Sequence, residues 1–107
     1  MLLETDRTFG CPVGSLALEL HEPDLVVRNL IADNFNAWTG AIEECLDAAG
    51  DRIPCETDLR GLAEFILTTM EGAVMQARTH RDIGFYDRSI TQLRTYFGLL
   101  ATARQNA

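Results

Sequence analysis

The sequence predicts an all-α domain of four helices, and three observations support this fold class. Apolar residues recur every three or four positions from Val27 to Ala49 and again from Leu59 to Leu100, which is the spacing of amphipathic helices. No segment alternates apolar and polar residues as a strand does. Gly, Pro and Asp stand where the helical segments are expected to begin or end.

The length of 107 residues indicates one domain. We interpret residues 1–9 as a lead-in without a period of its own, residues 10–103 as the helical core, and residues 104–107 as a tail that frays. The first predicted helix begins at Gly10-Cys11-Pro12, with proline near the first turn, and ends before His21-Glu22-Pro23.

The second predicted helix begins at Pro23-Asp24 and stops at Gly50-Asp51. Its apolar stripe consists of Val27, Leu30, Ile31, Asn34, Trp38, Ala41, Ile42, Cys45, Leu46 and Ala49. Asn34 is the polar member of this stripe, and Cys45 is expected to be a small core residue. In the loop that follows, Ile53-Pro54 is expected to hold the turn against the core.

The third and fourth predicted helices form a hairpin. Thr57 or Asp58 caps the third helix, which ends near His80-Arg81 with cations at its negative end. The link 82–84 is short, so the fourth helix, from Phe85 to Ala103, should lie antiparallel to the third.

Both helices of this hairpin carry more apolar surface than one core requires. Beside each core stripe runs a second row, made of Gly61, Phe65, Gly72 and Gln76 on the third helix and Tyr96, Leu99 and Ala103 on the fourth. A helix in a small domain needs one apolar stripe. We therefore expect a homodimer in which two helices from each copy form a shared four-helix bundle.

The residues assigned to this dimerisation are Phe65, Gly72, Gln76, Leu93, Tyr96, Phe97 and Leu100. Gly72 is the most informative of them, because a glycine inside a helix costs about 1 kcal/mol relative to alanine. A close approach of another backbone at this position would offset that cost.

A ligand pocket between helices is also predicted. Its candidate lining residues are Asn34, Phe35, Trp38, Phe65, Ile66 and Met70. An apolar cavity with one polar anchor is the usual composition of a small-molecule site. The alternative interpretation is that these residues simply form the core, and the sequence leaves both open.

Composition and motifs argue against several function classes. The net charge is −7 and all nine basic residues are scattered arginines, so we expect no nucleic-acid binding by this chain. No apolar run approaches the roughly 20 residues that cross a bilayer, and no signal peptide is evident, which indicates a cytoplasmic protein without membrane contact. The carboxylates in residues 43–47 indicate a solvated helix face. His21 and His80 have no partner four residues on, and His80 with Asp82 indicates a helix-end cap.

The cysteines are Cys11, Cys45 and Cys55. Their odd number and the absence of a CxxC spacing argue against a disulfide framework or a zinc site. Without a nucleophile elbow or a glycine-rich phosphate loop, we expect no catalytic residue, no metal and no cofactor.

Four segments resemble one known family in order and spacing. They are Phe9–Leu20, with a Gly-Cys step leading into a short helix, Phe35–Trp38 in the long helix, and Met70–Arg78 and Gln92–Phe97 in the hairpin. Together, over residues 9 to 100, they resemble the C-terminal regulatory domain of tetracycline-repressor (TetR) type transcriptional regulators.

The resemblance implies an effector-binding and dimerisation domain that senses a small, largely apolar ligand. The family's helix-turn-helix domain has no counterpart before residue 9, so the resemblance implies DNA binding only for a longer protein. Two alternatives remain: a ligand-free dimerisation module or truncated regulator that acts through protein–protein interaction, and a small helical enzyme.

Overall fold

The computed structural model describes residue 13 and residues 24–106. This part contains helix α3 (Leu25–Ala48), the short 3-10 helix η1 (Gly50–Arg52), helix α4 (Leu59–His80) and helix α5 (Gly84–Gln105). The described residues contain no strand, which confirms the all-α class. They hold three α-helices rather than the predicted four, because the first predicted helix lies outside the described residues except for Val13.

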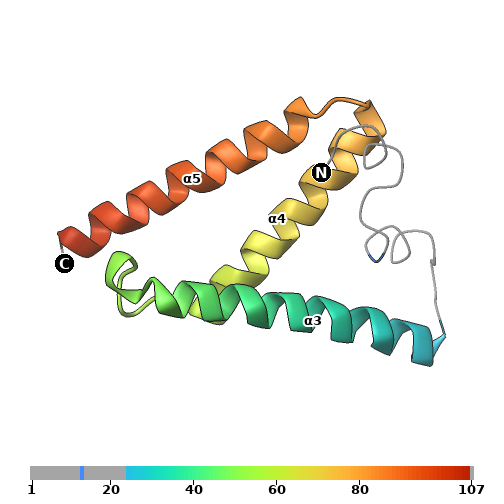
Figure 1. Cartoon of the computed structure of the whole chain (residues 1–107), viewed down its shortest axis with the longest axis horizontal. Helices are drawn as coiled ribbons and strands as arrows, with labels where there is room; N and C mark the ends of the chain where they lie inside the picture. Colours follow the sequence, from blue (N-terminus) through green and yellow to red (C-terminus); the bar gives the residue numbers. More distant parts are fainter. Residues whose placement is uncertain (1–12, 14–23, 107) are drawn as a thin grey trace.

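The three helices follow the sides of a flat triangle (Figure 1). Helix α4 packs against both α3 and α5, and η1 packs against the far end of α5. The helices α4 and α5 are joined by the short loop 81–83 and form the predicted hairpin. The triangle brings the C-terminal half of α3 to the beginning of α4, and one long face of the hairpin turns away from α3 (Figure 1).

Aspartates cap the first two of these helices. The side chain of Asp24 accepts a hydrogen bond from the Val27 N–H at 2.9 Å, and that of Asp58 accepts one from the Gly61 N–H at 3.0 Å. Each carboxylate satisfies a backbone donor that has no partner inside the helix. Asp58, not Thr57, is therefore the cap of α4, and both predicted helix starts are confirmed.

The hairpin loop turns through one left-handed residue. Arg81 has φ 52° and ψ 44°, and the backbone N–H of Asp82 reaches back to the carbonyl oxygen of Ala77 at 3.0 Å. This geometry ends a helix by satisfying its last carbonyls. The Asp82 carboxylate then accepts the Gly84 N–H at 2.8 Å and starts α5. A Cβ on Gly84 would lie 2.7 Å from Arg88 Nη1 and 3.0 Å from Asp82 Oδ1, so a larger residue here would require these side-chain ends to shift.

The helix α5 is longer than the sequence predicts. It continues to Gln105, and the Asn106 N–H still bonds to the Thr102 carbonyl at 3.1 Å. The predicted end at Ala103 is therefore two residues short of the observed end. The good helix formers arginine and glutamine follow that position, so nothing in the local sequence stops the helix there.

The core lies where the three helices meet η1. Its buried members are Leu46, Ile53, Leu62 and Ala63, and Ile42, Leu59, Ile66, Phe97 and Leu100 pack around them. Ile53 is only 4% exposed, which confirms that the loop after α3 is held against the core. Among the described residues no large side chain is fully buried, so this core is thin.

The prediction that Cys45 is a small core residue was wrong. Cys45 is exposed, because its neighbour Leu46 occupies the core position and the predicted stripe is wider than the contact with α4. The predicted solvated face holds for Glu44 and Asp47, which are exposed, whereas Glu43 is partly covered and its carboxylate lies 3.4 Å from the Arg60 guanidinium of α4. Thr39, which the apolar pattern omits, is instead one of the buried residues of α3.

Hydroxyl groups along the hairpin bond to their own helix. The donors are Thr79, Ser89, Thr91, Thr95 and Thr102, each to the carbonyl oxygen four residues earlier. Their donor–acceptor distances lie between 2.8 and 3.1 Å. Four of the five belong to α5, so this helix satisfies its hydroxyl protons internally.

Candidate ligand groove and dimerisation face

One surface of the hairpin is apolar and faces solvent. Phe65 of α4 is 49% exposed, and Tyr96 and Leu99 of α5 are 41% and 64% exposed. The rings of Phe65 and Tyr96 meet edge to face, with centroids 5.8 Å apart. Together with Gly72 and Gln76 we call these residues the α4–α5 face. The surplus apolar row predicted from the sequence is therefore present on the described chain.

Gly72 lies in open space in the single chain. No atom outside its own helix backbone comes within 4 Å of the position that its Cβ would take. Nothing within the described chain explains a glycine at this point of α4. A close approach of a partner backbone at Gly72 stays a prediction.

The other predicted dimerisation residues divide into two groups. Gln76, Phe65 and Tyr96 are exposed, so each of these three is available to a partner. In contrast, Leu93 is buried, and Phe97 and Leu100 pack against the chain's own core. The sequence predicts that these α5 residues form one dimerisation row. In the structure one side of that row packs into the core of the chain and the other side faces solvent.

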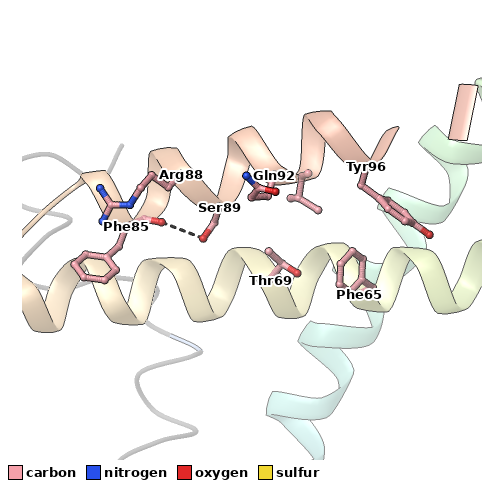
Figure 2. A pocket seen from close by; sticks show the side chains of 8 residues that line it. Phe65, Thr69, Phe85, Arg88, Ser89, Gln92 and Tyr96 are labelled. Atoms are coloured by element: carbon pink, nitrogen blue, oxygen red, sulfur yellow. Dashed lines mark hydrogen bonds between the residues drawn. The ribbon is translucent and has the colours of Figure 1, made fainter. Parts of the chain in front are cut away.

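A groove of about 330 Å³ runs between the two helices of the hairpin. It is lined by Phe65, Thr69, Phe85, Arg88, Ser89, Gln92, Leu93 and Tyr96. Figure 2 shows Thr69 rising from α4 toward α5, with Phe65 and Tyr96 at one end and Phe85 and Arg88 at the other. The groove is continuous with the α4–α5 face, because Phe65 and Tyr96 belong to both.

The two ends of the groove differ in chemistry. Phe65 and Tyr96 make one end aromatic. At the other end the Arg88 guanidinium lies over the Phe85 ring, 4.9 Å from its centroid. The ring of His80 is stacked on Phe85 at 4.1 Å. This end is therefore a cation held by an aromatic platform.

Polar side chains occupy the stretch between these ends. The Ser89 hydroxyl donates to the Phe85 carbonyl oxygen at 3.0 Å, so its oxygen remains an acceptor. Gln92 and Thr69 lie between the helices and add further donors and acceptors (Figure 2). Along its length the groove thus offers first an aromatic surface, then hydrogen-bonding groups, and finally a positive charge.

The pocket predicted from Asn34, Phe35, Trp38, Phe65, Ile66 and Met70 stays a prediction, and the structure places these six residues in different surroundings on α3 and α4. Phe65 alone of them lines the groove. Phe35 and Trp38 form an edge-to-face pair on α3, with centroids 5.9 Å apart, and both are half-buried. Ile66 packs against the core. Met70 is half-buried on α4.

Asn34 is exposed, and its side-chain amide donates to the Leu30 carbonyl oxygen at 2.9 Å. Its role as the polar anchor of a ligand site stays a prediction. The hydrogen bond to Leu30 uses one of the two protons of the Asn34 side-chain amide. The amide oxygen and the second amide proton remain for a ligand.

Sequence reasoning missed most residues of the groove. Thr69, Arg88, Ser89 and Gln92 are polar, and a search for apolar rows passes over them. A signal did exist, because residues 85, 88, 89, 92 and 96 follow the three- and four-residue spacing of one helix face. A search for polar as well as apolar residues along the exposed face of this helix would have found them.

The described residues hold no group of His, Cys, Asp or Glu side chains that could bind a metal ion. Within the same part of the chain, no helix has the length and apolar character to span a membrane. The cysteines Cys45 and Cys55 are both free and exposed, and Cys11 lies outside the described residues.

The described residues combine an all-α fold with a helical hairpin whose apolar face is exposed. The family model for the C-terminal domain of LmrA/YxaF-like transcriptional regulators, a TetR-type domain, matches residues 1–89. The chain belongs to this family of TetR regulator C-terminal domains. No curated protein and no solved structure matches the chain.

Proposed function

We propose that this chain is the effector-binding and dimerisation domain of a TetR-type regulator, without catalytic activity and acting in the cytoplasm. Membership of the regulator family supports the class of function. The exposed α4–α5 face is the observation that carries the dimer. Burying a large apolar side chain is worth roughly 1.5–3 kcal/mol, and three such side chains lie together on this face.

The proposed dimer places the hairpins of two copies against each other. The contact would use the same face on both copies, as a two-fold interface requires. Phe65 and Tyr96 would supply aromatic anchors, which are enriched where interfaces gain most of their energy. Gly72 would let a partner helix approach the backbone of α4.

Gly72→Leu tests this contact. The single chain has room for the new side chain, so the helix should form normally, but a partner backbone close to Gly72 would be pushed away. We expect the dimer dissociation constant, measured by sedimentation equilibrium, to rise at least about tenfold, a loss of about 1.4 kcal/mol.

Gly98→Leu is the matched control. Gly98 also lies inside a hairpin helix with no atom within 4 Å of its Cβ position, but it stands outside the α4–α5 face. This variant should keep the wild-type association. Equal behaviour of the two variants would contradict the assignment of Gly72 to the interface.

For the effector we propose a small, largely apolar ligand beside the Phe35–Trp38 pair. The pair is half-buried, and Ile66 and Met70 of α4 are half-buried too, while the Asn34 amide supplies a polar anchor. Aromatic rings and a flexible methionine side chain are suited to adapting around an apolar molecule.

Trp38 is the chain's single tryptophan and reports on this site. A neutral aromatic ligand that binds the folded state should raise the melting temperature. If it binds beside Trp38, it should also change the Trp38 fluorescence emission, because it changes the surroundings of the indole ring. Met70→Glu should abolish both changes, whereas Met75→Glu, at an exposed position of the same helix, should leave them. A melting-temperature increase that survives Met70→Glu would place the ligand elsewhere.

In a complete regulator the ligand would favour one arrangement of the helices over another and thereby shift the population that reaches the DNA-binding heads. The chain's own charge of −7 supports no DNA binding by this part. The alternative function is dimerisation without a ligand, including capture of a related regulator in a mixed dimer. A broad thermal-shift screen without stabilising ligands would favour this alternative.

A further inference from the structure

Among the described residues, Arg88 of the groove has no ionic partner. Its side chain is exposed, and no described carboxylate lies within 4.0 Å of its guanidinium. The Asp82 carboxylate, which accepts the Gly84 N–H, lies nearby but forms no ion pair with Arg88. Within this part of a chain of net charge −7, the guanidinium donors are available to an anion.

The guanidinium is also held in place. It lies over the Phe85 ring, which restricts a long side chain and leaves the in-plane N–H donors free. A planar guanidinium with free donors suits a carboxylate, which it can bind through two parallel hydrogen bonds. The first turn of α5 adds the positive end of the helix dipole, since Arg88 stands four residues after Gly84.

We propose that this groove binds a small aromatic carboxylate, with the carboxylate on Arg88 and the ring against Phe65 and Tyr96. The groove's 330 Å³ falls within the range of small-molecule sites, and its two ends match the two parts of such a molecule. Because Phe65 and Tyr96 also belong to the α4–α5 face, the partner copy covers the bound ligand. This cover rests on the dimer of the proposed function.

The site is separate from the apolar site proposed beside Trp38. Of the residues assigned to the two sites, only those of the groove include a cation, Arg88, and of the residues assigned to the apolar site only Phe65 lines the groove. The two sites therefore differ in the ligands that they select. A carboxylate is required for the groove, whereas the Trp38 site favours neutral molecules.

The test compares 2-naphthylacetate with its uncharged amide, using calorimetry on the full chain. The wild type should bind the carboxylate more tightly than the amide. Arg88→Gln should weaken carboxylate binding about 10- to 100-fold and leave amide binding unchanged, because hydrogen bonds to a charged group are lost. Arg94→Gln, another exposed arginine of α5, is the matched control and should bind like the wild type.

Sedimentation equilibrium of the same samples distinguishes the remaining outcomes. If Arg88→Gln dissociates the dimer without any probe, Arg88 pairs with a partner carboxylate and the ligand proposal is overturned. If wild type and Arg88→Gln bind the probe equally, or neither binds it, the proposal is also overturned. Arg88-dependent binding to a monomeric wild type would support the groove site while contradicting the dimer.

Discussion

Leu99→Asp is expected to convert the dimer into a folded monomer. Leu99 is 64% exposed in the single chain, so the change removes little packing from one copy. In the dimer it would bury two unpaired carboxylates, each costing several kcal/mol. We expect the dissociation constant to rise about 100-fold or more, since about 1.4 kcal/mol corresponds to a factor of ten. Sedimentation equilibrium measures the constant, and circular dichroism confirms that the helices remain.

Leu30→Asp provides the matched comparison. Leu30 is the same residue type, is 58% exposed, and lies on α3 rather than on the hairpin. Its variant should remain dimeric. If Leu99→Asp also remained dimeric at low protein concentration, two copies would have to meet through a different surface.

Leu62→Ala should cause a large loss of stability. Leu62 is 6% exposed and belongs to the buried cluster that also holds Leu46 and Ile53. Removing its side chain leaves a cavity in a thin core, and such changes cost about 2–5 kcal/mol. Because a domain of this kind is stable by only about 5–15 kcal/mol, urea unfolding should show a midpoint far below that of the wild type.

The exposed Leu25 gives the control for this experiment. It is 61% exposed in the first turn of α3, so Leu25→Ala should change the free energy of unfolding by no more than about 0.5 kcal/mol. Both variants must be compared at one protein concentration, because dimerisation adds a concentration-dependent contribution. A loss at Leu62 no greater than that at Leu25 would contradict the core assignment.

Local chemistry explains why most of the described fold was predictable. Asp24 and Asp58 are caps whose hydrogen bonds reach three residues along the chain, and such signals are present in the sequence itself. The hairpin follows from a loop too short to allow any other arrangement. The exposed apolar row on α4 and α5 also follows from spacing alone, because its residues exceed what one core requires.

The relation between helices was less accessible. Ten residues form the predicted stripe of α3, yet only Ile31 and Leu46 among them are buried in the described structure, because α4 contacts only part of α3. This crossing leaves Cys45 in solvent and brings Glu43 to Arg60. The crossing point of two helices depends on all the packed side chains at once, and no short sequence window contains it.

The candidate site shows the same limit. Phe65 was assigned to a pocket with α3 residues, and in the structure its ring packs edge to face on Tyr96 of α5. The direction of one side chain thus decides which pair of helices forms a cavity. Arg88 and Gln92 were not found because only apolar residues were followed along each helix.

The hydroxyl groups of α5 that bond to their own backbone lower the cost of removing water from this helix surface. Thr91, Thr95 and Thr102 lie along one side of the helix, and each has already given its proton to a carbonyl of the preceding turn. Water can therefore be removed from this side of α5 without leaving a threonine hydroxyl donor without a hydrogen bond. This row of threonines is polar in the sequence. When another molecule covers it, the row presents mainly its methyl groups and behaves like an apolar surface.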